Sequence, residues 1–289
     1  PAGPGGRALL ATYRVPDRSP RVELRLRTIE GRYGLLQAYV VPHASPKTAL
    51  ARTYQIKPLS LHQRLPGAPS AADLAARPMS ELRISGSFSV AEMHSWIAAA
   101  LPEVPERVPG DEVSYTFRSS LLGTLLTCAY SRGEGLVRSD NLTALTTLKE
   151  AVAREASSRK QQIRTAMEVD RRTVGAMLRR VDPLLRHQTS LSHRVRLLEP
   201  LEELVQQEGN ASFLHPDYQD ALAKAQTIRQ EHAQMPRQLE YLIGVVADLY
   251  VDKAKLKGRG GEERLAALDR LIRTEYSLEA LLDFFDEQG

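Results

Sequence analysis

Apolar and polar residues alternate in the first sixty positions, which predicts β-strands. Val22, Leu24 and Leu26 alternate with charged neighbours, and this period of two indicates a strand with one buried face. Residues 33–41 are apolar on both faces, as is typical of a central strand, and residues 48–56 predict a third strand. Because three strands leave an open sheet edge, we expect preceding strands outside this chain to complete a β-sandwich.

Residues 66–78 read PGAPSAADLAARP, a stretch rich in proline and alanine. Such a composition predicts a loop or linker. We therefore place a first domain at residues 1–65, this linker at 66–78, and a second domain at 79–187.

The second domain alternates strand and helix patterns. Ser89 is a suitable N-cap for a short helix that carries Trp96 and ends before Pro102. Residues 112–117 and 121–130 predict a β-hairpin, and Asp140 is placed to cap a second helix. Five apolar residues share one face of that helix: Leu142, Leu145, Leu148, Val152 and Ala156. With a strand at 162–169 and a helix at 170–185, the order β-α-β-β-β-α-β-α predicts an α+β domain with helices on one side of a mixed sheet.

From residue 188 to 289 only helical patterns appear. We predict helices at about 190–208, 217–233, 237–257, 262–274 and 277–286, with breaks at 209–210, at Pro236 and at 258–261. Leu239, Leu242, Val246 and Leu249 form an apolar stripe with helical spacing. A stripe of this kind must be buried against another helix, so we expect a helical hairpin or small bundle.

Positive charge is concentrated near the N-terminus. Residues 1–64 contain eleven Lys and Arg against three acidic residues, whereas residues 140–289 contain 22 basic and 24 acidic residues. A basic strand face is a candidate surface for an acidic partner or anionic lipid, and a solvated sheet face is the plainer alternative. The residues of this basic strand face are Arg21, Arg25, Arg27, Arg32, Lys47, Arg52 and Lys57.

The sequence contains no recognisable catalytic, cofactor or metal motif. The single cysteine, Cys128, excludes an internal disulfide and a Cys-based zinc site, and it fits a reducing compartment. No apolar run is long enough to span a membrane, and the N-terminal residues lack the apolar core of a signal peptide. We therefore expect a protein that is not an enzyme, and we expect no small-molecule substrate. Aromatic residues are only 6% of the chain and no recognition motif is present, so we expect no nucleic-acid partner.

Five stretches resemble one family closely. EGRYGLLQAYVVPHASPKT, YQIKPLSLHQR, FSVAEMHSWIAAALPEVPE, YSRGEGLVRSDN and LEALLDFFDE are similar to the C-terminal portion of Bardet–Biedl syndrome protein 7 family members, which are subunits of the BBSome. The resemblance runs from about residue 9 to residue 285. It implies the last strands of an adaptin-ear-like β-sandwich, then an appendage-like platform, then an all-α hairpin, and it departs from the family pattern at 66–78 and at GRGGEER.

The resemblance also implies a function. The family belongs to a coat-like complex that carries membrane proteins to and from cilia with intraflagellar transport, so we expect a non-catalytic scaffold subunit. Expected partners are other BBSome subunits, notably Bardet–Biedl syndrome proteins 2 and 9, and ciliary membrane-protein cargo. Expected locations are the cytoplasm, the cilium, the ciliary basal body and, peripherally, the ciliary membrane.

The sequence is compatible with two kinds of contact surface. The first is an assembly interface formed by the apolar residues of the tail, and an equally good alternative is that these residues only pack the hairpin against itself. The candidate assembly residues are Leu239, Leu242, Val246, Leu249, Leu278, Leu281, Leu282 and Phe285. A second reading is a peptide- or anionic-lipid-binding adaptor, which would use a groove beside Trp96 or the basic strand face.

Overall fold

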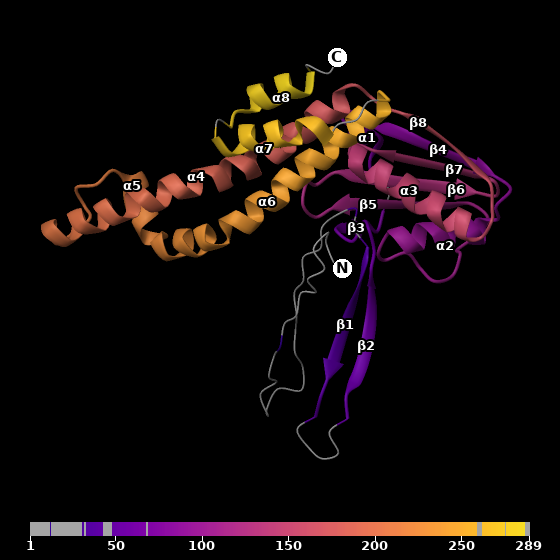
Figure 1. Cartoon of the computed structure of the whole chain (residues 1–289), viewed down its shortest axis with the longest axis horizontal. Helices are drawn as coiled ribbons and strands as arrows, with labels where there is room; N and C mark the ends of the chain where they lie inside the picture. The colour runs from indigo at the N-terminus through magenta and orange to yellow at the C-terminus, as the bar shows by residue number, and fades with distance from the viewer. Residues whose placement is uncertain are drawn as a thin grey trace. The chain divides into compact units, whose positions relative to one another are not determined.

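The computed structural model describes residues 12, 31, 33–42, 48–67, 69–258, 262–274 and 276–286 (Figure 1). The chain divides into two compact units. The first consists of residues 1–139 and 144–168, and the second of residues 140–143 and 169–289.

A six-stranded antiparallel sheet is the framework of the first unit. Its spatial order is β3-β5-β6-β7-β4-β8. The strands are β3 (His62–Arg64), β4 (Ser80–Gly86), β5 (Val113–Ser119), β6 (Leu125–Ser131), β7 (Glu134–Ser139) and β8 (Ile163–Glu168). The predicted hairpin is confirmed, because β5 and β6 pair directly along six residues.

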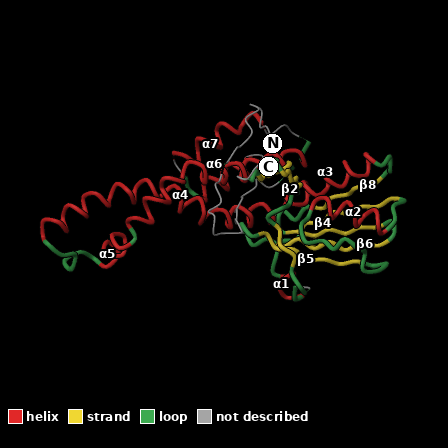
Figure 2. The backbone as a smooth tube through the Cα atoms, turned by 90° about the horizontal axis from the view of Figure 1, so that it is seen from below, coloured by secondary structure: helices red, strands yellow, loops and turns green. Residues whose placement is uncertain are grey.

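Two helices, α2 (Val90–Ala100) and α3 (Leu142–Ser158), lie on one side of this sheet (Figure 2). Side chains from both helices and from the strands form a single apolar core. The five apolar residues predicted to share one face of α3 are all at most 1% exposed, so that prediction is confirmed. The exposed side chains of Arg83 and Arg118 lie on the opposite side of the sheet.

Local sequence signals explain how α2 begins. Ser89 Oγ accepts a hydrogen bond from the N–H of Glu92, and Glu92 accepts one from the N–H of Ser89 at 2.7 Å. This capping box satisfies two N–H groups that a helix start leaves unpaired. The predicted N-cap is therefore confirmed, and Leu101 ends the helix before Pro102.

Two elements of the first unit were missed by sequence reasoning. The strand β3 joins the sheet beside β5 although it lies before the proline-rich stretch 66–78. That stretch contains a one-turn helix, α1 (Ala71–Ala75), with Ser70 as its N-cap. Both elements are too short for hydrophobic periodicity to reveal them.

Upstream of the sheet, β1 (Gly34–Val40) and β2 (Leu50–Ile56) form a two-stranded antiparallel pair. These strands confirm the predicted pattern at 33–41 and 48–56, whereas the strand around Val22 lies outside the described residues. The expectation that β1 is buried on both faces is wrong for the described chain, since Leu35 is 60% exposed and Tyr39 is 63% exposed. The reason is that no described layer packs against this pair.

The second unit is entirely helical. Its elements are α4 (Arg172–Glu208), α5 (Pro216–Ala223), α6 (Ala225–Leu256), the 3-10 turn η1 (Glu262–Arg264), α7 (Leu265–Thr274) and α8 (Leu278–Asp286). The long helices α4 and α6 pack along one another as a hairpin (Figure 1). Gly209 ends α4 in a left-handed conformation with φ of 75°, as predicted for a break at 209–210.

Two predicted breaks in this unit are wrong. The helix pattern was expected to be interrupted near residue 188, but α4 continues without a break and contains Pro183 and Pro200. Likewise Pro236 lies inside α6, and the break falls earlier, at Lys224. Each proline removes one backbone hydrogen bond, and burial of the continuous apolar face outweighs that loss.

Candidate functional site

The predicted apolar stripe on α6 lies in the interior of the hairpin. Val246 is 0% exposed and Leu249 is 1% exposed, and Leu239 and Leu242 are also buried. The stripe faces the neighbouring helices of the second unit, of which α4 is the most extensively packed. These four side chains therefore hold the hairpin together and leave no apolar surface open to a partner.

Aromatic rings join α8 to α6. Phe285 is 1% exposed, and its ring centre lies 5.2 Å from that of Tyr250 in an edge-to-face arrangement. Leu281 is buried beside it, whereas Leu278 and Leu282 are half-buried. Of the eight residues predicted as an assembly interface, only these last two present apolar surface.

One lysine fixes the end of α8. Lys253 Nζ on α6 donates a hydrogen bond to the carbonyl oxygen of Phe285 at 2.7 Å and lies 3.6 Å from a carboxylate oxygen of Asp286. A cation at this position favours a helix C-terminus, where carbonyl groups lack helical partners. Partial burial lowers the pKa of Lys253, and the nearby Asp286 opposes that shift.

A second polar contact joins the segment before α8 to α4. Tyr276 Oη donates to Asp182 Oδ1 at 2.7 Å, and Arg186 Nε donates to both oxygens of Asp182 at 2.8 and 3.0 Å. Burial, and then the bond to Asp182, raise the pKa of the Tyr276 hydroxyl. The three side chains thus act as a clasp, the Tyr276 clasp, which positions α8 on the hairpin.

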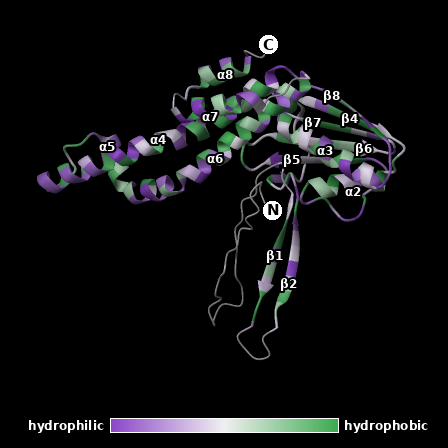
Figure 3. Cartoon of the chain, viewed as in Figure 1, coloured by the Kyte–Doolittle hydropathy of each residue, from purple (hydrophilic) through white to green (hydrophobic). Residues whose placement is uncertain are grey.

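The tip of the hairpin, where α4 turns into α5, combines exposed apolar and acidic side chains. Leu204 is 44% exposed, Phe213 51% and Tyr218 46%. Residues 197–223 contain no Lys or Arg, and their acidic residues are Glu199, Glu202, Glu203, Glu208, Asp217 and Asp220. Figure 3 shows the alternation of purple and green at this end of the hairpin.

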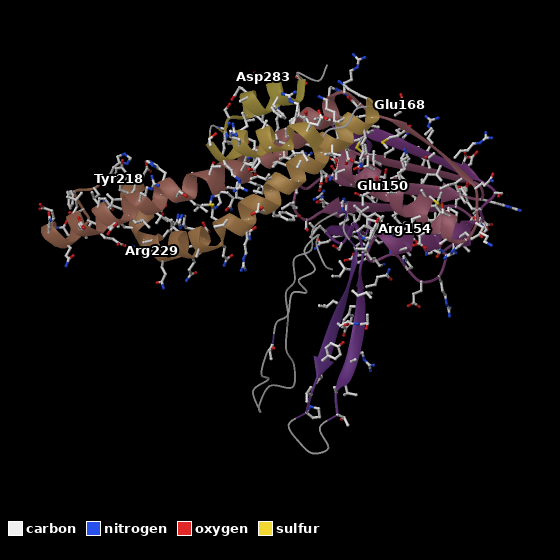
Figure 4. The ribbon with its side chains drawn as sticks, viewed as in Figure 1. Glu150, Arg154, Glu168, Tyr218, Arg229 and Asp283 are labelled. Carbon is white, nitrogen blue, oxygen red and sulfur yellow. The ribbon has the colours of Figure 1, made fainter. Side chains whose placement is uncertain are left out.

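Two of these six carboxylates are paired with the start of α6. Arg229 contacts Glu202 at 2.6 Å, and Lys224 contacts Asp220 at 2.8 Å. Tyr218 and Arg229 project from opposite sides of the hairpin (Figure 4). Sequence reasoning missed this acidic tip, although the absence of basic residues across 27 positions was a usable signal.

The predicted basic strand face is only partly described. Arg21, Arg25, Arg27, Arg32 and Lys47 lie outside the described residues. Arg52 is exposed on β2, whereas Lys57 donates a hydrogen bond from Nζ to the carbonyl oxygen of Leu101 at 2.9 Å. Partial burial lowers the pKa of Lys57. Of the two described residues, only Arg52 is fully available to an anionic partner.

The predicted groove beside Trp96 is not a surface feature. Trp96 is 0% exposed and its ring packs edge-on against that of Phe88, with centres 5.4 Å apart. It is a core residue of the first unit, so its ring offers no surface to a peptide.

The buried polar groups of the first unit have structural roles. His94 Nε2 donates to the carbonyl oxygen of Pro105 at 2.7 Å, which leaves Nδ1 as acceptor for the hydroxyl of Tyr130, also at 2.7 Å. Burial raises the pKa of the Cys128 thiol to about 12, so this thiol is not reactive at neutral pH.

Within the described ranges, no group of three or more His, Cys, Asp or Glu side chains is arranged to hold a metal ion. Among the same residues, no helix is both long enough and apolar enough to cross a membrane.

Three family models match consecutive stretches of this chain. A BBS7 GAE domain model matches residues 4–54, a BBS7 platform domain model matches residues 62–170, and a BBS7 hairpin model matches residues 172–285. The predicted order of an ear-like part, a platform and a helical tail is therefore confirmed.

Two relatives show the same similarity. The mouse (Mus musculus) BBSome complex member BBS7 is 40% identical over 279 residues, and the Caenorhabditis elegans BBSome complex member bbs-7 is 31% identical over 280 residues. Each match covers 96% of this chain, and the chain spans 38% of the length of each relative.

Proposed function

The chain belongs to the BBS7 family, and from this premise we propose that it is a non-catalytic subunit of a BBSome complex. The observation that carries the proposal is the match to three consecutive BBS7 domain models, together with 40% identity to a mouse BBSome member over 96% of this chain. In that role it acts as a scaffold in the traffic of membrane proteins to and from cilia and in ciliogenesis. Its partners are other BBSome subunits, notably Bardet–Biedl syndrome proteins 2 and 9, and ciliary cargo.

The helical tail supports this role through rigidity. Its apolar stripe is buried in the interior, and α8 is held by Lys253 and by the Tyr276 clasp. The stripe consists of Leu239, Leu242, Val246 and Leu249. A rigid hairpin presents its exposed end at a fixed place, which lowers the entropy cost of binding. We place the subunit contact of the tail at its acidic tip, around Leu204, Phe213 and Tyr218.

The physical chemistry of the tip favours this assignment over the interior stripe. Interfaces are enriched in aromatic residues that are surrounded by polar groups, and Phe213 and Tyr218 stand among carboxylates in this way. The half-buried Leu278 and Leu282 add a smaller apolar surface on α8. The reading in which anionic lipid is the partner rests on Arg52 alone among the described residues, since Lys57 is engaged internally.

The test is a pulldown of this chain against each of the other purified BBSome subunits. The surface variant Phe213→Asp is compared with the core variant Leu242→Asp and with Arg118→Glu, an exposed residue of β5. If the proposal holds, at least one subunit is captured by the wild type and by Arg118→Glu, and Phe213→Asp loses it while its circular dichroism is unchanged. Capture of no subunit contradicts the assembly role of this chain. Capture that Phe213→Asp leaves intact contradicts the role of the tip.

A further inference from the structure

The strand β8 forms an open edge of the six-stranded sheet. It pairs with β4 along six residues, from Gly86↔Ile163 to Glu81↔Glu168, and no described strand pairs with its other side. The opposite edge, β3, is only three residues long. An edge strand exposes a row of backbone N–H and C=O groups that can pair with an added strand.

The side chains of β8 alternate strictly between two environments. Ile163, Thr165 and Met167 are half-buried, and Ile163 and Met167 pack against the core. Arg164, Ala166 and Glu168 are exposed on the other face. Glu168 marks the end of the strand in Figure 4.

The residues at the beginning of β8 are basic and lie beside a hollow in the surface. Arg159, Lys160 and Arg164 are exposed within six residues that contain no acidic side chain. Beside them is a hollow of about 740 Å³, lined by residues of β4, α3 and β8 that include Ser85, Ser157 and Arg164. The amide oxygen of Gln161, which also lines the hollow, is buried and has no hydrogen-bond partner within the described chain.

We propose that the β8 edge binds an extended peptide that adds a seventh strand to the sheet. The peptide carries acidic side chains beside Arg159, Lys160 and Arg164, a basic side chain opposite Glu168, and β-branched residues on the face of Ile163, Thr165 and Met167. Backbone pairing supplies affinity and the alternating side chains supply specificity, as in other cases of strand addition. The cross-strand charge pairs fix the register, because like charges placed opposite one another are destabilising.

This inference goes beyond the proposed function, since the β8 edge lies in the first unit and the acidic tip in the second. The two can fail independently.

The probes are two fluorescein-labelled synthetic peptides. Thr-Lys-Val-Thr-Val-Glu-Val-Glu suits antiparallel addition, because it places its lysine opposite Glu168, a glutamate opposite Arg164 and its valines on the face of Ile163, Thr165 and Met167. Its reverse sequence suits parallel addition. Binding to the 289-residue chain is measured by fluorescence polarisation in 50 mM salt. We expect one of the two peptides to bind, and we expect slower hydrogen exchange of β8 amides in the complex.

Matched variants separate strand addition from simple charge attraction. Arg164→Glu should weaken binding about fivefold or more, and a peptide whose glutamates are replaced by lysines should recover that loss. Arg118→Glu makes the same charge change on β5 and should leave affinity within about twofold. A peptide N-methylated at the alternate residues whose N–H groups point towards β8 should not bind, because it cannot donate the backbone hydrogen bonds.

Four results would overturn the proposal. They are the absence of binding by both peptides at 1 mM, equal weakening by Arg164→Glu and Arg118→Glu, undiminished binding of the N-methylated peptide, and unchanged exchange of the β8 amides. Circular dichroism of each variant shows that its fold is retained. The second and third results would assign the binding to charge alone.

Discussion

The Tyr276 clasp provides a sharp test of how the tail is held together. Replacement of Tyr276 by phenylalanine removes one hydroxyl group and keeps the ring. The lost bond, from Tyr276 Oη to Asp182 at 2.7 Å, is short and ends on a carboxylate. We therefore expect α8 and the segment before it to open more easily, while the hairpin itself stays folded.

The magnitude follows from what remains after the substitution. A hydrogen bond to a charged group contributes about 1.5–3 kcal/mol, and the half-exposed position of Tyr276 favours the lower end. Asp182 also keeps both bonds from Arg186, so no unpaired buried charge is created. We expect a loss of about 1.5 kcal/mol, which corresponds to a roughly tenfold larger population of the open state and hence roughly tenfold faster hydrogen exchange.

Hydrogen exchange measured by mass spectrometry on residues 276–286 is the appropriate assay, because it reports local opening. Tyr218→Phe is the matched control, since Tyr218 is 46% exposed on α5 and its hydroxyl makes no described hydrogen bond. The double variant Tyr276→Phe with Asp182→Asn should cost less than the sum of the single changes. Exchange of residues 276–286 that is as slow in Tyr276→Phe as in Tyr218→Phe would refute the clasp.

Three further predictions concern the first unit. Trp96→Ala should lower the free energy of unfolding by about 3–5 kcal/mol in urea titrations followed by circular dichroism, because the ring is fully buried; a loss below about 1 kcal/mol would contradict its core position. Gly133→Ala should destabilise the unit by at least about 1 kcal/mol, since Gly133 has φ of 75° and a Cβ there would lie 2.9 Å from the carbonyl oxygen of Gly86. Gly67→Ala is the control, because a Cβ at Gly67 meets nothing within 4 Å. The Cys128 thiol should react with a thiol reagent at pH 8 only after unfolding, and labelling of the native protein at the rate of a free thiol would contradict this. Its pKa in the folded protein is about 12, above the ordinary value of 9.0, so the free energy of unfolding should fall as the pH rises from 9 towards 12.

Signals encoded in a few neighbouring residues predicted the first unit well. Ser89 and Glu92 specify the start of α2 through local hydrogen bonds, and the spacing of Leu142, Leu145 and Leu148 specifies the buried face of α3. These features depend on the backbone of a single element, so the sequence contains them. The β5–β6 hairpin was predictable for the same reason.

Features that depend on distant partners were predicted poorly. The sequence pattern suggested helix ends near residue 188 and at Pro236, yet burial of a long apolar face keeps α4 and α6 continuous through both positions. The pattern around Leu239 and Phe285 indicated burial correctly but did not distinguish an internal partner from an external one. Trp96 was open to the same ambiguity, and the fold resolves it by placing the ring in the core.

The candidate surfaces were also hard to predict from local sequence signals. The acidic tip was overlooked because its signal is the absence of Lys and Arg over residues 197–223, and absences do not resemble motifs. The β8 edge was predicted as a strand, but its place at the end of the sheet depends on pairing with β4, which is about eighty residues away in the sequence.

The central claim, that this chain is a BBSome subunit, is tested most directly by a chimera. In mouse cells that lack their own BBS7, the segment of mouse BBS7 that matches this chain is replaced by the chain itself, and native fractionation follows the assembled complex. The account predicts that the chimera co-fractionates with the other BBSome subunits at equal stoichiometry. A folded chimera that migrates alone, under conditions in which intact mouse BBS7 assembles, would contradict it.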